Sequence, residues 1–350
     1  MTVHSRVAPV VDAAFIEDRL DRYGTMVRER MIEYFPRRGP RRNLYDLVTE
    51  YPLRPSKMLR SVICVASCAA HGGDVERAVD TAVAIEFIHN AFMIHDDIED
   101  DSDERRGRPS LHVEHGVPLA LNVGDAMSFL SLTPLLENAR TLGTDTAFEI
   151  LHEFAQVVAR TIEGQAIELG WIHDGDVDID ESDYLEMVLL KTCWYTTILP
   201  CRAGKLAATG SVGSDDFVRF GTYFGSSFQI RDDVLNLIGG EAYGKEIGGD
   251  VHEGKRTMML VHLLRSCTAD ERDEVIDIYR APREERREAS IRRVVELMHH
   301  YGSVDRAASG AHGLAGAALA EFEREFEGVP DNDDRRFLRD LVIHLVNRAR

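Results

Sequence analysis

Apolar residues recur at helical spacing along most of this sequence, and that periodicity limits the possible folds more than any other feature. In the segment Ala14–Tyr34, for example, Ile16, Leu20 and Val27 fall on one face of a helix. Segments that alternate apolar and polar residues, as half-buried strands do, are not found at convincing length. Proline is also scarce, with 11 residues in a chain of 350. The sequence therefore predicts an all-α fold.

Similar helices are predicted near Lys57–His71, Val75–Asp100, Leu119–Thr141, Thr144–Leu169, Glu181–Thr209, Asp215–Ile238, Thr257–Cys267, Asp270–Tyr279, Glu285–His300, Val304–Glu327 and Asp331–Arg348. Glycine-containing turns separate these segments, and neither a low-complexity linker nor a repeat of fixed period divides the chain. We therefore expect a single helical domain over residues 1–350, larger than a four-helix bundle, with residues 1–10 as a loose tail.

The charge balance excludes two broad classes of partner. The chain has 60 Asp and Glu against 41 Lys and Arg, a formal net charge of −19. Nucleic-acid binders carry a basic face, and proteins that bind anionic membranes carry polybasic segments. The N-terminus has no apolar leader, and the apolar stretches are too short or too interrupted to predict a membrane span.

The cysteines favour a reducing compartment. Five cysteines form no CxxC pair, which is typical of reduced thiols in a cytoplasmic protein. Cys64 and Cys68 lie one helical turn apart in an apolar segment. We interpret them as small core residues rather than metal ligands, because no His or Cys is spaced to complete a zinc site.

An acidic cluster follows the predicted helix over Val75–Asp100. Seven acidic residues occupy the nine positions from Asp96 to Glu104. A charge run is usually a solvated face, but this one ends an apolar helix and precedes a basic segment that begins at Arg105. On a helix, Asp96 and Asp100 lie on one face about 6 Å apart, with Asp97 beside them. Carboxylates so close repel one another unless a cation lies between them, and Mg²⁺ that bridges to phosphate is the usual cation.

A second acidic pair repeats this arrangement later in the chain. Asp232 and Asp233 follow another apolar helix, and Asn236 offers an oxygen donor one turn further on. If the two clusters face each other across a cavity, they could hold several Mg²⁺ ions and a diphosphate between them. A glycine-rich segment downstream carries Lys245 and Lys255, which could meet phosphate oxygens, although its spacing is not that of a P-loop.

In this order, the motifs resemble those of the trans-isoprenyl diphosphate synthases, the polyprenyl synthetase family, over nearly the whole chain. The family's first motif, DDxxD followed by RRG, matches Asp96, Asp97, Asp100, Arg105, Arg106 and Gly107. Its second motif, FQxxDDxxD, matches Phe228, Gln229, Asp232 and Asp233, with Asn236 in place of the last aspartate. Smaller matches are Lys57 and Arg60 in a GKxxR-like segment that begins with Ser56, His89 before the first motif, Gly164-Gln165, and Lys191-Thr192.

The resemblance implies an isoprenoid synthase fold, with helices around a central cavity, in a homodimer. It also implies head-to-tail transfer of an allylic group, from dimethylallyl, geranyl or farnesyl diphosphate, to isopentenyl diphosphate. The resemblance further implies three Mg²⁺ ions per active site. Their ligands would be Asp96, Asp100 and Asp232, supported by Asp97, Asp233 and Asn236. The allylic diphosphate would contact Arg105, Lys191, Lys245 and Lys255. Isopentenyl diphosphate would contact Lys57, Arg60, His89 and Arg106. Thr192 and Gln229 would direct oxygen dipoles at the developing carbocation.

Phe92 is the predicted determinant of product length. It lies one turn before Asp96, which at 1.5 Å per residue is roughly 6 Å further into the pocket, with the small Ala91 beside it. A phenylalanine there could form a floor that stops chain growth. The first motif also lacks the two-residue insertion that family members making farnesyl diphosphate often carry. We therefore favour geranylgeranyl diphosphate (C20), with farnesyl diphosphate (C15) as the alternative.

Two other functions fit parts of the sequence. A class I terpene cyclase also uses an acidic DDxxD cluster, but its second metal motif is usually an Asn/Ser/Glu triad. A non-catalytic subunit that regulates a partner synthase would explain the departures from the family at Ser56, Met58 and Asn236.

Overall fold

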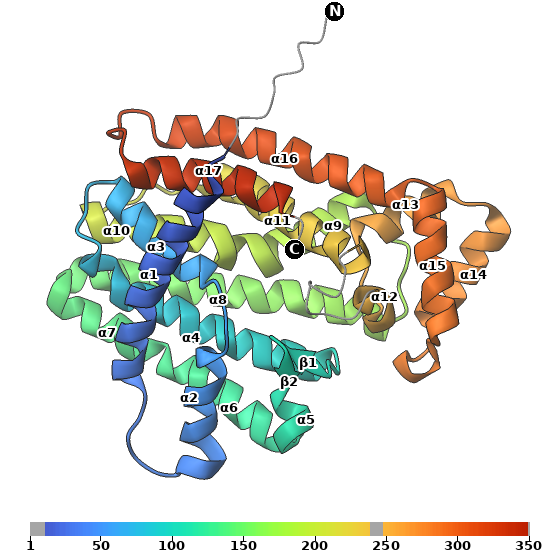
Figure 1. The fold of residues 1–350 in the computed structure, drawn as a ribbon, viewed down its shortest axis with the longest axis horizontal. Coiled ribbons are helices and arrows are strands. Elements are labelled where there is room, and N and C mark those ends of the chain that lie inside the picture. Colours follow the sequence, from blue (N-terminus) through green and yellow to red (C-terminus); the bar gives the residue numbers. More distant parts are fainter. Residues whose placement is uncertain (1–10, 239–247, 349–350) are drawn as a thin grey trace, which may run out of the picture.

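The computed structural model describes residues 11–238 and 248–348 and is all-α apart from one short hairpin (Figure 1). In chain order its elements are α1 (Ala13–Tyr34), the π-helix η1 (Arg41–Tyr45), α2 (Asp46–Glu50), the 3₁₀ turn η2 (Tyr51–Leu53), α3 (Leu59–Ala70), α4 (Glu76–Glu99), β1 (Glu104–Arg105), β2 (Arg108–Pro109), α5 (Leu111–His115), α6 (Val117–Leu130), α7 (Leu132–Thr141), α8 (Thr144–His173), α9 (Glu181–Val188), the π-helix η3 (Leu189–Ile198), α10 (Leu199–Thr209), α11 (Val218–Ile238), α12 (Gly249–Glu253), α13 (Met258–Ser266), α14 (Ala269–Arg280), the 3₁₀ turn η5 (Arg283–Glu285), α15 (Glu288–His300), α16 (Ser303–Glu325) and α17 (Asp333–Asn347). The predicted tail, residues 1–10, and Lys245 lie outside the described residues.

The long helices pack side by side around one core. In Figure 1, α4 and α8 run across the middle of the molecule, α16 and α17 lie above them, and α14 and α15 lie at one end. Helix α11 packs mainly on α16 and η3, α3 on α10, and α4 on α3 and α6. Most of the buried apolar side chains form one connected cluster, and the single domain stays a prediction.

Most predicted helices are confirmed, but two of them are divided. The segment predicted as Leu119–Thr141 forms α6 and α7, which meet at Ser131; Pro134, in the first turn of α7, has no N–H to continue the ladder. The segment predicted as Glu181–Thr209 contains α9, η3 and α10 in succession. π-helical turns inside longer helices are often found at functional sites, and η3 carries Lys191 and Thr192.

The prediction that no sheet forms is wrong at one place, just after the first acidic cluster. Strands β1 and β2 pair antiparallel, with Arg105 opposite Arg108. Arg106 and Gly107 between them have φ of 57° and 71°, as the favoured two-residue hairpin turn requires. Strands of two residues are too short to show any alternation in the sequence, but the tight turn fixes where Arg105 and Arg106 lie.

Helix α3 begins later than predicted, and this separates two residues of one motif. Met58, the N-cap, adopts a left-handed conformation with φ of 47° and ψ of 38°. Lys57 therefore precedes the helix, whereas Arg60 lies in its first turn. The predicted helix start at Lys57 is therefore two residues too early.

One segment of the described residues, Val117–Thr141, is long and apolar enough to cross a bilayer. It consists of α6 and α7, and 39% of its most apolar window is buried inside the fold. Length and composition alone are weak support for a span, because core helices of globular proteins share them.

Candidate active site

A cavity of about 810 Å³ lies between α4, α8, η3 and α11, and it contains most of the predicted site residues. Those that line it are Arg60, His89, Phe92, Asp96, Arg105, Lys191, Thr192, Gln229, Asp232, Asp233, Asn236 and Lys255. Among the described residues, Lys57, Ala91, Asp97, Asp100 and Arg106 were also predicted for the site but do not line this cavity. Both acidic clusters thus reach one cavity, from α4 and from α11.

The carboxylates of the first cluster point in two directions. Asp96 faces the cavity, 3.4 Å from Lys191 Nζ and 3.6 Å from Arg105 Nη2. Asp97 is 1% exposed and turns away; it accepts hydrogen bonds from Tyr51 Oη at 3.0 Å and from Arg105 Nε at 2.6 Å. Burial raises the pKa of Asp97, although Arg105 opposes that shift. Asp97 therefore orients Arg105, and its predicted role at the metal remains a prediction.

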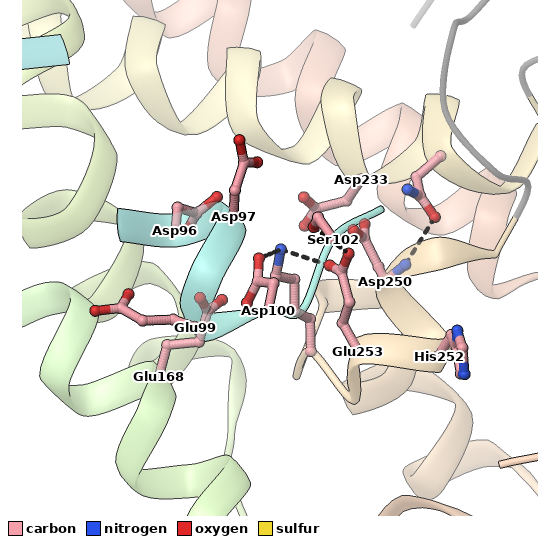
Figure 2. A network of polar contacts seen from close by, with 12 residues as sticks. Asp96, Asp97, Glu99, Asp100, Ser102, Glu168, Asp233, Asp250, His252 and Glu253 are labelled. Atoms are coloured by element: carbon pink, nitrogen blue, oxygen red, sulfur yellow. Dashed lines mark hydrogen bonds and ion pairs between the residues drawn. The ribbon is translucent and has the colours of Figure 1, made fainter. Parts of the chain in front are cut away.

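Asp100 belongs to a second acidic group that extends to α12. Lys255 Nζ lies 2.6 Å from Asp100 Oδ2 and 2.7 Å from Glu253 Oε2. Figure 2 shows the side chains of Asp100, Asp233, Asp250 and Glu253 gathered beside one another, although they come from three different helical segments. Burial raises the pKa of Asp100 to about 7 despite the neighbouring lysine. A cation at this place would favour the ionised carboxylate.

The second cluster is fixed by hydrogen bonds within the cavity wall. Asp233 accepts from Tyr184 Oη at 2.7 Å and from Gln229 Nε2 at 2.8 Å, and burial raises its pKa. Gln229 in turn accepts from Thr192 Oγ1 at 2.9 Å. Thr192 and Gln229, which were predicted to act together, are therefore in contact.

The flanking residues of the second cluster contact parts of the chain far away in sequence. Asn236 Oδ1 accepts from the backbone N–H of Asp250 at 3.1 Å and thereby anchors the start of α12. Asp232 forms an ion pair with Arg348, whose guanidinium also lies 4.8 Å from the centre of the Phe228 ring.

Lys191 is the central cation of the cavity. It forms an ion pair with the buried Glu168 and also contacts Asp96. Burial alone would lower the pKa of Lys191, but Glu168 and then Asp96 raise it above its ordinary value. Lys191 is therefore a cation at neutral pH.

Gly164 sets the distance between α8 and the backbone of Lys191. A Cβ atom on Gly164 would lie 2.7 Å from Lys191 Cα and 2.8 Å from the carbonyl carbon of Leu190. Real Cβ atoms do not approach backbone so closely, so only glycine lets the two segments pack at this distance.

We expect Gly164→Ala to lower the turnover rate at least tenfold, because η3 must shift and carry Lys191 with it. Gly170→Ala is the matched control on the same helix, since its Cβ would meet nothing within 4 Å. It should leave the rate unchanged and, as a helix substitution, stabilise by roughly 0.5–1 kcal/mol. Steady-state rates and thermal unfolding of both variants test this, and equal rates would contradict it.

A second group of basic residues, Arg60 on α3 and His89 on α4, also lines the cavity. Arg60 donates to Tyr195 Oη at 2.7 Å and to Thr196 Oγ1 at 3.1 Å, and it lies 3.4 Å from His89 Nε2. Burial lowers the pKa of His89, as do the arginines around it, so the ring is neutral. Its Nδ1 atom is buried with no hydrogen-bond partner among the described residues, which leaves it available to a ligand. Lys57 is exposed on the segment before α3.

The donor set suits a metal held jointly with a phosphate ligand. Within the described residues, no three Asp, Glu, His or Cys side chains form a ready-made metal cage. Mg²⁺ usually binds through one or two carboxylates while waters and substrate phosphates fill its other positions. Carboxylates that face one cavity from α4 and α11, with lysines between them, fit that manner of binding.

Several residues of the site were missed by the sequence analysis. Glu168, Asp250 and Glu253 add carboxylates, and Tyr184 and Tyr195 hold Asp233 and Arg60. Glu168 lies one turn after the Gly164-Gln165 pair, so helical spacing could have placed it on the same face. The tyrosines carry no such signal, because an aromatic residue at helical spacing is usually part of a core.

Known proteins resemble this chain in sequence and in fold. The sequence model of the family described as polyprenyl synthetase matches residues 42–298. A short chain isoprenyl diphosphate synthase from Methanothermobacter thermautotrophicus is 29% identical, covering 95% of this chain and 98% of its own. A geranylgeranyl diphosphate synthase from Saccharolobus solfataricus is 35% identical, covering 62% and 65%.

Among solved structures, the chain is similar to a polyprenyl synthase from Caulobacter crescentus, complexed with calcium and isoprenyl diphosphate. The TM-score is 0.83 at 27% identity, with 95% of this chain and 98% of that chain covered. The family match spans most of the chain and both acidic clusters, and the fold agrees over nearly its whole length. The chain therefore belongs to the polyprenyl synthetase family, the trans-isoprenyl diphosphate synthases that its motifs resemble, and is a trans-prenyltransferase.

Proposed function

We propose that this enzyme adds isopentenyl diphosphate head-to-tail to an allylic diphosphate and releases a short-chain product, geranylgeranyl diphosphate. The observation that carries the proposal is the meeting of two aspartate clusters and two groups of basic side chains at one largely apolar cavity. The S. solfataricus relative, named a geranylgeranyl diphosphate synthase, supports the C20 product. Dimethylallyl, geranyl and farnesyl diphosphate are the proposed primers.

In this proposal the two substrates occupy different basic groups. Lys191, Arg105 and Lys255 contact the allylic diphosphate, because they border the aspartates. Arg60, His89 and Arg106, which lie near one another, contact isopentenyl diphosphate. Lys57 and Lys245 remain further proposed contacts. Arginine forks and lysine point charges stabilise the charge that grows on a departing diphosphate.

Mg²⁺, three ions in our proposal, would be held by Asp96, Asp100 and Asp232, and when bound it supplies Lewis-acid stabilisation of the leaving diphosphate. Thr192 and Gln229 present oxygen dipoles to the allylic carbon that becomes cationic. Apolar side chains such as Phe92 exclude the water that would otherwise capture the cation. The final proton can leave to the released diphosphate, so no further catalytic base is needed.

Turnover of pure protein tests the proposal directly. With Mg²⁺, labelled isopentenyl diphosphate and each primer in turn, we expect elongated prenyl diphosphates, chiefly C20, whose label becomes extractable only after phosphatase treatment. With EDTA in place of Mg²⁺, turnover should stop and diphosphate should bind at least tenfold more weakly, because the cavity then presents mainly carboxylates. Equally tight binding in EDTA would contradict the metal site.

The same assay separates the two other functions. Hydrocarbon formed without isopentenyl diphosphate would indicate a cyclase, and no turnover without a partner protein would indicate a regulatory subunit. The structure favours elongation over cyclisation, because the second cluster is a pair of aspartates on α11 and the basic group around Arg60 would have no use in a cyclase.

We also propose that the protein is a homodimer formed through α6, α7 and α8. Large apolar side chains on these helices are 48% to 75% exposed, and patches of this kind usually mark interaction sites. They are Val117, Leu121, Phe129, Leu136, Phe148 and Ile162. Sedimentation should give twice the chain mass of 39.3 kDa; a mass of one chain would contradict the dimer.

The free cysteines of the described residues suit the proposed cytoplasmic location.

A further inference from the structure

A buried carboxylate lies behind the basic group proposed for isopentenyl diphosphate, and no predicted motif includes it. Glu86 and Asn90 lie one turn apart on α4, and both are 0% exposed. Glu86 Oε2 accepts a hydrogen bond from Ser61 Oγ at 2.8 Å. Glu86 Oε1 accepts from Asn90 Nδ2 at 3.2 Å, and the same amide nitrogen donates to the carbonyl of Glu86 at 2.7 Å.

The other end of the Asn90 amide contacts Arg106. Arg106 Nη1 donates to Asn90 Oδ1 at 3.3 Å, so one amide connects the buried carboxylate to the guanidinium. Arg106 lies in the tight turn between β1 and β2, where its φ is 57°. The turn places its backbone, and the hydrogen bond to Asn90 limits where its side chain can point.

The charges of Glu86 and Arg106 affect each other across Asn90. Burial lowers the pKa of Arg106, and Arg105 and Arg60 lower it further, whereas Glu86 raises it. A buried carboxylate is itself unfavourable unless it is hydrogen-bonded and near a cation. Glu86 and Arg106 therefore stabilise each other's charges, although no direct contact joins them.

A direct contact would have the opposite effect on function. A carboxylate that pairs with an arginine takes up two of its five N–H donors and cancels the charge that should attract an anion. Asn90 is neutral, donates to the carboxylate and accepts one bond from the guanidinium. Most donors of Arg106 remain free for phosphate oxygens.

We propose that Asn90, supported by Glu86, is a positioning residue that orients Arg106 for isopentenyl diphosphate while keeping the buried carboxylate out of direct contact with it. The proposal rests on the proposed function, in which Arg106 contacts that substrate. Asn90 should therefore affect the affinity for isopentenyl diphosphate and leave the affinity for the allylic diphosphate unchanged.

Asn90→Leu tests it, because leucine has a similar size and neither donates nor accepts. We expect the KM for isopentenyl diphosphate to rise about tenfold, while the KM for the allylic primer changes less than twofold. Asn138→Leu is the matched control. Asn138 is also 0% exposed, and it also donates to a residue of α4, Thr81 Oγ1 at 2.9 Å. Thr81 precedes Asn90 by nine residues on that helix, so this contact does not involve Arg106. Asn138→Leu should lower thermal stability and leave both KM values unchanged.

A double-mutant cycle shows whether Asn90 acts through Arg106. In an Arg106→Met background, Asn90→Leu should raise the KM for isopentenyl diphosphate no further. An undiminished effect in that background, or a KM within twofold of the wild type in the single variant, would overturn the proposal. If Asn90→Leu does not fold, Asn90→Ser should raise the same KM in the same direction. If the wild type does not elongate, the proposed function fails, and calorimetric binding of isopentenyl diphosphate to the same variants decides the proposal instead.

Discussion

Replacing Asp96 by alanine should abolish chain elongation. Asp96 is the aspartate of the first cluster that lines the cavity, close to Lys191 and Arg105. A metal that stabilises a leaving group contributes several kcal/mol, and at 1.36 kcal/mol per tenfold change a loss of about 4 kcal/mol slows turnover roughly 1,000-fold. Single-turnover rates with Mg²⁺ and the preferred primer measure the loss.

The fold should tolerate Asp96→Ala, because Lys191 keeps its ion pair with Glu168. Asp103→Ala is the matched control, since Asp103 belongs to the same acidic run but is exposed and does not line the cavity. It should elongate at the wild-type rate. A full rate in Asp96→Ala, or an equal loss in both variants, would refute the metal site on α4.

Shortening Phe92 should lengthen the product. Phe92 lines the cavity, and its ring meets the Tyr195 ring edge-on with centroids 5.7 Å apart. Removing the ring leaves space into which a growing chain can extend, so Phe92→Leu and Phe92→Ala should shift the main product stepwise toward C25 and longer. Mass spectrometry of the products after phosphatase treatment gives the distribution.

Phe87 provides the control for that series. It lies on the same helix, is 0% exposed, and also makes an edge-on contact, with Phe35 at 5.8 Å, but it does not line the cavity. Phe87→Leu should cost stability and leave the product distribution unchanged. A distribution that is also unchanged in Phe92→Ala would show that another part of the cavity ends growth. Ala91, the other predicted determinant, is buried outside the cavity lining.

The fold class and most residues of the candidate site could be predicted because they depend on local patterns. Helical periodicity placed α1, α4, α8 and α11, and the two acidic motifs placed the aspartates at the ends of α4 and α11. The sequence could not show which side chains of a motif face the cavity. Asp97 turns toward Tyr51, 46 positions away in sequence, and Asn236 bonds to a backbone amide of α12. Such choices depend on packing between segments that no short motif contains.

The same reason explains the errors at the start of α3 and in the chain between α9 and α10. The left-handed conformation of Met58 delays the start of α3, and a methionine side chain gives no signal of such a conformation. A π-helix has nearly the residue pattern of the α-helix around it, so η3 was not separable from its neighbours by periodicity. In the structure, η3 brings the backbone of Lys191 close to Gly164 on α8.

The lysines of the cavity are paired with the same carboxylates that are proposed to hold metal, Lys191 with Asp96 and Lys255 with Asp100. A metal ion on these aspartates would separate them from the lysines, which would keep only their pairs with Glu168 and Glu253. A diphosphate on the lysines would in turn separate them from the aspartates. Each ligand therefore removes a competitor of the other, and the two bind cooperatively. By thermodynamic linkage, the factor by which metal strengthens diphosphate binding equals the factor by which diphosphate strengthens metal binding. The ion pairs of the ligand-free enzyme thus make it selective for the metal–diphosphate combination over either component alone.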